Sequence, residues 1–261
     1  MKRTYVKLLT VAGLTGCFLF TSCRSAQETT ARYEISKVEG NMITIDSTWD
    51  ANPDKKATTV LKPYKDKVDA MMYEVIGTSE MKMDKGTPES LLSNLVASVL
   101  QEAAAQVLGK PADMGLVNMG GLRNILPKGD ITVGAVFEIL PFENSLWVLT
   151  MKGTDMKRLF KAIASLHGEG VSGIRLEINK KGELLNATIG GKPVVDDQLY
   201  TVATIDYLAD GNGRMDAFLQ AEKRECPEDA TLRGLFLDYV RKQTAEGKII
   251  TSKLDGRITV K

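Results

Sequence analysis

The sequence is poor in the residues from which most hydrolytic metal centres are built. Its 261 residues contain a single histidine, His167, and three cysteines. Zinc and di-metal centres normally draw on several histidine and carboxylate ligands, so this chain cannot furnish such a set by itself. His167 stands at the end of a predicted helix, where histidine more often interacts with the helix dipole than acts as a base. No GxSxG-like segment accompanies it, which argues against a serine hydrolase.

Phosphate-binding loops and an excess of charge are missing as well. There is no P-loop and no GxGxxG after a predicted strand, and IGGK at 189–192 is interpreted as a turn. The 34 basic and 33 acidic side chains leave a formal net charge of +1. We therefore expect no binding to nucleic acid. The 43% of hydrophobic residues is ample for a folded core.

The N-terminus has the layout of an export signal. A basic segment, MKRTYVK, precedes the apolar run LLTVAGLTGCFLF, which is too short to span a membrane, and the chain then turns polar. Cys17 and Cys23 each follow small residues, in LTGC and FTSC, and both contexts resemble the lipobox of bacterial lipoproteins. Cleavage before Cys23 would remove the whole apolar run. We predict a lipoprotein signal peptide over residues 1–22 and lipidation of Cys23, with Cys17, or an ordinary signal peptide, as alternatives.

The predicted product is an exported protein that a lipid alone holds at a bacterial membrane. Only Cys226 would remain in the folded part, so an internal disulfide is excluded and the domain must be stabilised by its core. Residues 23–50 are expected to form a tether and a first strand, and residues 51–261 the folded domain.

Hydrophobic periodicity predicts interleaved helices and strands. Apolar spacing indicates a helix that runs into an extended stretch over 62–80, and a clear helix over 87–109 with Thr87 as its cap and Gly109 at its end. Further helices are expected over 154–166 and 231–243. Strands are expected before the turn at 118–123, over 145–153 and repeatedly within 175–211. This pattern favours an α+β fold with mixed or antiparallel sheets and helices packed outside.

Two loops carry residues that could bind a ligand. In NMGGLR at 118–123, adjacent glycines let the backbone approach a ligand, while Asn118 and Arg123 could donate to an anionic or oxygen-rich group. A simple turn is the alternative. In YLADGNGRMDAFL, the oxygens of Asp210, Asn212 and Asp216 could bind calcium. The segment lacks the full EF-hand pattern, which favours a plain glycine-rich turn.

The motifs occur in an order that is similar to a known family. PESLLSNLVASVL is followed by GLVNMGGLR, by GDITVGAVFEILPFEN with LTMKGTDMKRLF, by TVATIDYLADGNG, and by a terminal DGRI. In this order and spacing they resemble the C-terminal substrate-binding domain of the 5'-nucleotidase family, over roughly residues 60–260. The resemblance implies that domain's layered α/β/β/α fold.

The resemblance also implies a division of labour. Family members usually carry an N-terminal metallophosphatase domain with two metal ions, and this chain resembles the second, nucleoside-binding domain alone. We therefore expect a nucleotide-binding specificity subunit of a split 5'-nucleotidase, with no cofactor of its own and with divalent metal ions on a separate metallophosphatase subunit. By itself the chain is not expected to hydrolyse nucleotides. The alternative is a stand-alone surface lipoprotein that binds nucleosides or nucleotides without catalysis.

The family's site carries over to specific positions. The resemblance implies that Asn118 and Arg123 donate to substrate oxygens, while Gly120 and Gly121 allow the close approach.

Two further positions would hold the base. The resemblance implies that the base lies between the rings of Phe142 and Tyr207, and such stacking reads base identity only weakly.

Two departures from the family pattern concern the ribose and the phosphate. The family often has an arginine where this chain reads ESLLSN, and Leu91 cannot replace its charge. An aspartate that commonly holds the ribose hydroxyls falls at Gly213, although Asp210 and Asp216 are close in sequence. Asp210 is therefore the expected substitute, and weaker binding of ribose or phosphate is expected.

Overall fold

The computed structural model describes residues 34–261, so the predicted signal peptide, with Cys17 and Cys23, lies outside the described residues. The chain divides into a segment that ends at Pro53 and a compact unit, Asp54–Lys261. Residues 34–45 have no regular secondary structure, and Ser47–Ala51 form the 3-10 helix η1. The first strand predicted within 23–50 is therefore wrong over residues 34–50. Every side chain in that stretch is exposed, so none is buried against a neighbouring strand.

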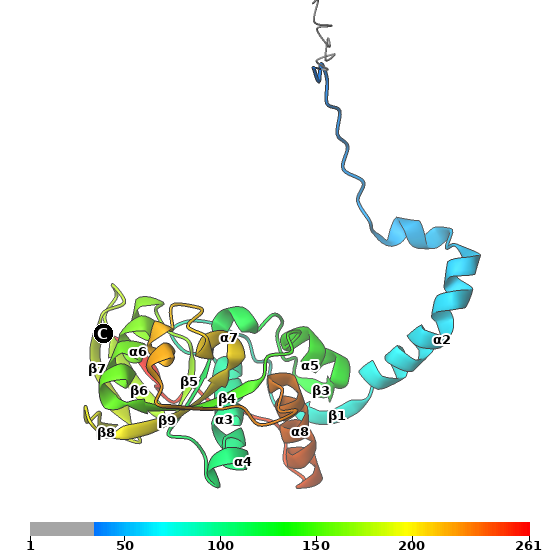
Figure 1. Cartoon of the computed structure of the whole chain (residues 1–261). Coiled ribbons are helices and arrows are strands. Elements are labelled where there is room, and N and C mark those ends of the chain that lie inside the picture. The colour runs from blue at the N-terminus through cyan, green and yellow to red at the C-terminus, as the bar shows by residue number, and fades with distance from the viewer. Residues whose placement is uncertain (1–33) are drawn as a thin grey trace, which may run out of the picture. The chain divides into compact units, whose positions relative to one another are not determined.

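The compact unit starts with the helix α2 (Lys55–Met72), which is followed by strand β1 (Val75–Ser79) (Figure 1). This confirms the prediction of a helix that runs into an extended stretch, although the helix starts earlier than expected. Asp54 caps it by accepting a hydrogen bond from the backbone of Ala57. No residue of α2 is buried, and its neighbour in the fold is α5 (Val133–Ile139).

The largest sheet has five strands in the order β10-β4-β9-β2-β5. Its pairs are antiparallel except for β2 and β9, which run parallel. The strands are β2 (Met114–Val117), β4 (Leu146–Lys152), β5 (Gly170–Ser172), β9 (Leu199–Ile205) and β10 (Lys223–Glu225).

Two smaller sheets complete the strand inventory of the described residues. A four-stranded sheet has the order β11-β6-β7-β8, with β11 and β6 parallel, and β1 pairs with β3 in a two-stranded sheet. The strands not yet delimited are β3 (Gly129–Thr132), β6 (Ile174–Ile178), β7 (Leu184–Ile189), β8 (Lys192–Pro193) and β11 (Ile258–Val260). The mixed α+β architecture predicted from the sequence is confirmed.

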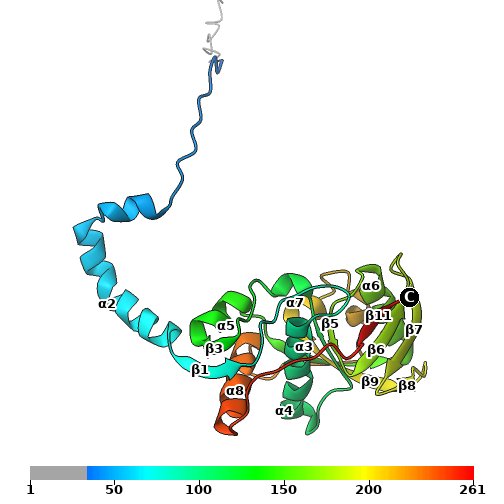
Figure 2. The same ribbon diagram turned by 180° about the vertical axis from the view of Figure 1, so that it is seen from behind.

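Helix α3 (Leu91–Ala103) is the central helix of the domain (Figure 2). It packs on β2, β5 and β9 and contacts α8 (Leu232–Ala245). The stretch Leu91–Leu108 is apolar enough to cross a membrane by composition, but half of it is buried inside the domain, as expected of a core helix. The remaining helices are α4 (Ala105–Leu108), α6 (Gly153–Ser165), α7 (Asp206–Ala209) and the 3-10 helices η2 (Met119–Gly121) and η3 (Asp216–Gln220).

The two ends of the predicted 87–109 helix had different outcomes. Gly109 ends the helical stretch in the left-handed conformation, with φ 69°, as predicted. The cap at Thr87 is wrong, because helix α3 begins at Leu91 and the Ser90 hydroxyl accepts from the backbone of Ser93 at 3.3 Å. Both serine and threonine are common N-cap residues, with serine preferred, so residue type alone allowed a helix start at either position.

Candidate functional site

Three chain segments meet at one edge of the five-stranded sheet. Because β2 and β9 are parallel neighbours, with Met114 opposite Val202, their carboxyl ends lie at the same edge. Strand β4 is antiparallel to β9 and begins there, with Leu146 opposite Ile205. The turn at 118–121, the start of α7 and the segment 141–145 are therefore adjacent in space, although they are far apart in sequence.

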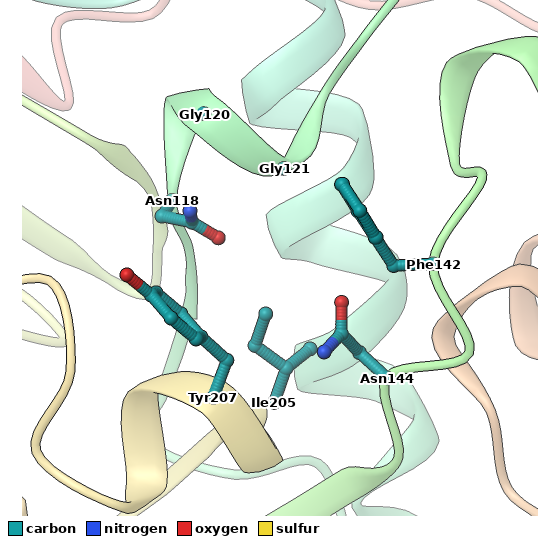
Figure 3. Close-up of a pocket in the computed structure, with 7 residues that line it drawn as sticks. All are labelled: Asn118, Gly120, Gly121, Phe142, Asn144, Ile205 and Tyr207. Atoms are coloured by element: carbon teal, nitrogen blue, oxygen red, sulfur yellow. The ribbon is translucent and has the colours of Figure 1, made fainter. Parts of the chain in front are cut away.

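These segments enclose a cavity of about 320 Å³ (Figure 3). This volume is at the lower end of the range for small-molecule sites, roughly 300–1,000 Å³. The side chains and backbone that line it are Asn118, Gly120, Gly121, Phe142, Asn144, Ile205 and Tyr207. The structure thus brings together Asn118, Gly120, Gly121, Phe142 and Tyr207 of the residues predicted from the sequence.

The glycine turn is shaped around the side chain of Asn118. The backbone N–H of Gly121 donates to the carbonyl of Asn118 at 3.0 Å, and that of Leu122 donates to the carbonyl of Met119 at 3.2 Å, so η2 has two consecutive 3-10 bonds. A Cβ atom at Gly121 would lie 2.9 Å from Asn118 Oδ1, closer than normal van der Waals contact. A Cβ at Gly120 would lie 3.4 Å from Asn118 Nδ2. Glycine at 121 therefore leaves the room that the Asn118 amide occupies.

Asn118 Oδ1 is the one buried side-chain polar atom without a hydrogen-bond partner within residues 34–261. It points from the turn toward the space between the two rings (Figure 3). Such an atom loses its hydrogen bonds to water and recovers them only from a bound donor.

The rings of Phe142 and Tyr207 stand on opposite sides of this space (Figure 3). They are 48% and 44% exposed, which is high for aromatic side chains beside a core. Arg123 lies at the rim, where its Cζ atom is 5.8 Å from the centroid of the Phe142 ring and its Nη1 donates to the carbonyl of Gly120 at 3.2 Å. Arg123 does not line the cavity itself.

Asp210 lies outside the cavity lining. Its Oδ1 accepts from Arg224 Nη2 at 3.0 Å, and its side chain is 65% exposed. Gly213 adopts a left-handed φ of 65°, and Leu91 is the first residue of α3. The predicted contact between Asp210 and a ligand stays a prediction. The calcium alternative also stays a prediction. Within residues 34–261 no three His, Cys, Asp or Glu side chains are grouped for a metal ion.

Sequence reasoning missed Asn144 and Ile205 as lining residues. Asn144 Nδ2 donates to Asp206 Oδ1 at 2.7 Å, and the same oxygen accepts from the backbone N–H of Tyr207 at 2.7 Å. This bond joins the segment that bears Phe142 to the segment that bears Tyr207. The motif PFEN contained Asn144, so its position could have been proposed together with that of Phe142.

A partly buried carboxylate lies behind the glycine turn. Glu169 accepts a hydrogen bond from the backbone N–H of Met119. Burial raises the pKa of the Glu169 carboxyl, and the hydrogen bond from Met119 opposes that shift. Nothing in the sequence around ASLHGEG signalled this role, because the contact joins residues 50 positions apart.

Two arginines hold the ring-bearing segments from outside the cavity. Arg233, on α8, donates to the carbonyls of Leu140 and Pro141 at 3.3 and 3.1 Å, next to Phe142. Arg224, on β10, donates to the carbonyl of Ala209 at 2.9 Å, at the end of the helix that carries Tyr207. The positions of the two rings therefore depend on side chains that do not line the cavity.

Comparison with known proteins identifies relatives of this arrangement. The family model described as "5'-nucleotidase, C-terminal domain" matches residues 75–220. The trifunctional nucleotide phosphoesterase YfkN of Bacillus subtilis is 27% identical over 84% of this chain and 16% of its own length. The cell wall protein Lmo0130 of Listeria monocytogenes is 27% identical over 81% of this chain and 30% of its own length.

A crystal structure of a 5'-nucleotidase precursor from Thermus thermophilus superposes with a TM-score of 0.66 and 26% identity. The match covers 81% of this chain and 44% of that protein. The chain thus spans less than half the length of these relatives.

Proposed function

We propose a function for this chain, which belongs to the family of 5'-nucleotidase C-terminal domains. Membership implies nucleotide binding. The proposal is that the chain is an exported, nucleotide- or nucleoside-binding specificity subunit of a split 5'-nucleotidase. Among its relatives, a nucleotide phosphoesterase supports the proposed nucleotide binding, and a cell wall protein supports the proposed export.

The observation that carries the proposal is the pair of half-exposed rings across one cavity. Phe142 and Tyr207 leave room for a flat ligand between them (Figure 3). Stacking of a base on an aromatic side chain contributes on the order of 1–3 kcal/mol and tolerates any base, because every base has a π-face. A cavity of about 320 Å³ suits a base and part of a sugar.

Arg123 is the proposed contact for the sugar or phosphate. Its side chain lies beside the Phe142 ring at the cavity rim, and one of its nitrogens is engaged by Gly120. A guanidinium has five N–H donors, so others remain for ligand oxygens. Asp210 would have to give up its bond to Arg224, or share it, to reach a ribose hydroxyl.

Hydrolysis is assigned to a separate metallophosphatase chain, which would bring the divalent metal ions. One histidine in 261 residues is too few for a histidine-rich di-metal centre. The residues of this chain would bind and orient the nucleotide, and the partner would supply the nucleophile.

The binding half of the proposal is tested by calorimetry with AMP and adenosine. Phe142→Ala and Tyr207→Ala should each weaken binding about tenfold or more, because each removes one stacking face. Tyr64→Ala is the matched control, since this exposed ring on α2 lies outside the cavity lining. Arg123→Ala should weaken AMP more than adenosine if Arg123 contacts the phosphate, and both equally if it contacts the ribose. Absence of binding by the unmodified chain would refute the proposal.

The catalytic half is tested by hydrolysis of AMP. The purified chain with added divalent metals should show no activity, and activity should appear with a co-purifying metallophosphatase. Turnover by the chain alone at rates typical of whole 5'-nucleotidases would contradict the split arrangement. A chain that binds nucleotides without any such partner would instead be a stand-alone binding lipoprotein, the second candidate function.

Anchoring by a lipid on Cys23 is the proposed localisation, at the periplasmic or outer face of a bacterial membrane. Cys23→Ala should release the protein from membranes and abolish its acyl label, while Cys17→Ala should change neither. The reverse result would assign the anchor to Cys17.

A further inference from the structure

The orientation of an amide side chain in the cavity gives it a hydrogen-bonding preference that the sequence motifs do not indicate. Asn144 lines it, and the two ends of its amide face different surroundings. Nδ2 donates to Asp206 Oδ1 at 2.7 Å, and Oδ1 is directed toward the space between the rings (Figure 3). An ionised carboxylate can only accept hydrogen bonds, so the amide nitrogen must be the atom that faces Asp206. Asp206 thereby fixes Asn144 as an acceptor toward the cavity.

Asp206 is itself held in place. It is the first residue of α7, directly after β9, and its Oδ1 also accepts from the backbone N–H of Tyr207. Its own backbone N–H donates to the carbonyl of Ser145 at 3.0 Å, beside Asn144. A turned-over Asn144 amide would therefore lose its bond to the Asp206 carboxylate and place its own oxygen against that acceptor.

A second amide oxygen faces the same space. Asn118 Oδ1 is buried without a partner among the described residues, and in Figure 3 it points toward the region between Phe142 and Tyr207. Both amide side chains of the cavity thus present acceptors. A ligand that offers N–H donors would satisfy them, whereas a ligand without donors would leave them unpaired.

We infer that this site, if it binds nucleotides as proposed above, selects bases that carry an exocyclic amino group. Stacking between the two rings holds any base, and the amide oxygens of Asn144 and Asn118 add the preference for an N–H donor. Asn144 is the specificity-determining residue, and Asp206 is the positioning residue that sets which end of its amide the ligand meets. The ligand class is an amino-substituted nucleobase on a nucleoside or nucleotide.

The test compares adenosine with purine riboside, which has the same ring system without the amino group. Calorimetry on the purified full chain should show adenosine binding about tenfold more tightly, the equivalent of one hydrogen bond to an otherwise unpaired acceptor. Asn144→Leu should reduce this ratio strongly, and the ratio is the readout because any loss of stacking would weaken the binding of both ligands alike.

Two variants at Asp206 separate positioning from a purely structural effect. Asp206→Ala frees the Asn144 amide to present either end, so the ratio should fall to about twofold or less, whereas Asp206→Asn retains an acceptor oxygen and should restore most of the preference. A merely structural role would weaken both ligands in parallel and leave the ratio unchanged, and that result would overturn the assignment of Asp206.

The outcomes for the unmodified chain are also distinct. Equal affinity for adenosine and purine riboside would refute the amino-group preference while leaving nucleotide binding intact. Binding of neither ligand would refute the proposed function, and this inference with it.

Discussion

Removal of the Arg233 side chain should destabilise the domain far more than removal of a neighbouring arginine on the same helix. Arg233 is 8% exposed, although arginine is rarely buried. Its guanidinium lies 4.1 Å from the centroid of the Phe137 ring and donates to the carbonyls of Leu140 and Pro141. Arg233→Ala removes all of these contacts at once and leaves the buried carbonyl of Leu140 without its donor.

The expected loss can be estimated contact by contact. A desolvated cation–π contact contributes about 1–2 kcal/mol, and a charged donor to a buried carbonyl about 1.5–3 kcal/mol. The ion pair with Glu143, at 2.6 Å, adds less than about 1 kcal/mol because the Glu143 side chain is 78% exposed. These contributions overlap, so a total of about 3–4 kcal/mol is expected. For a domain of this size that corresponds to a fall in Tm of roughly 6–16 °C.

Thermal unfolding followed by circular dichroism is the assay, and Arg241→Ala is the control. Arg241 lies on the same helix and pairs with Glu74 at 3.2 Å, but both side chains are about half exposed. Its loss should change stability by less than about 1 kcal/mol. If the two variants melt within a degree or two of each other, burial does not distinguish these arginines and the reasoning fails.

Two further predictions concern the glycine turn. Because burial raises the pKa of Glu169, the Glu169 carboxyl keeps its proton to higher pH in the folded chain than in the unfolded chain. Protonation of Glu169 therefore stabilises the fold fully below the unfolded pKa of about 4.3, and this stabilisation is lost as pH rises through the folded pKa. Glu169→Gln should remove that part of the pH dependence in urea unfolding, and an unchanged profile would contradict it. Gly121→Ala would place a Cβ 2.9 Å from Asn118 Oδ1 and should weaken AMP binding about five- to tenfold, while Gly120→Ala, with a 3.4 Å contact to the same amide, should have little effect. Equal losses in calorimetry would exclude displacement of Asn118 as the cause.

Local patterns predicted the parts of this fold that depend on local forces. The helix that ends at Gly109 and the helix that precedes β1 follow from periodicity and from the residues that end helices. The mixed α+β class was predicted from the irregular order of helices and strands along the chain. The strand predicted within residues 23–50 is absent from residues 34–50 because strand formation also depends on non-local pairing. Its β-branched residues suit a strand locally, but a strand needs a partner, and that pairing is not a local property.

The residues of the candidate site also fall into two groups, those that a local motif indicates and those whose roles depend on contacts distant in sequence. Asn118, Phe142 and Tyr207 could be named because each stands in a recognisable motif. Asn144 and Glu169 were missed because their roles depend on contacts with residues distant in sequence, 62 positions apart for Asn144 and Asp206 and 50 for Met119 and Glu169. The antiparallel pairing of β4 with β9 brings Asn144 to Asp206, and the antiparallel pairing of β2 with β5 brings Met119 to Glu169.

The geometry of the ring pair is therefore a property of the whole domain rather than of its motifs. The family model matches residues 75–220, yet the arginines that hold the two ring-bearing segments, Arg224 and Arg233, both follow residue 220. Arg224 stacks against Trp147 at 5.0 Å and Arg233 against Phe137 at 4.1 Å, so each cation is tied to the core as well as to a loop. A relative with the same rings and glycine turn but without these arginines would hold its rings less firmly at a given separation. Stacking weakens when the distance between the two rings is too large or too small for both to contact the base. The affinity of such chains for nucleotides would therefore vary even where every lining residue is the same.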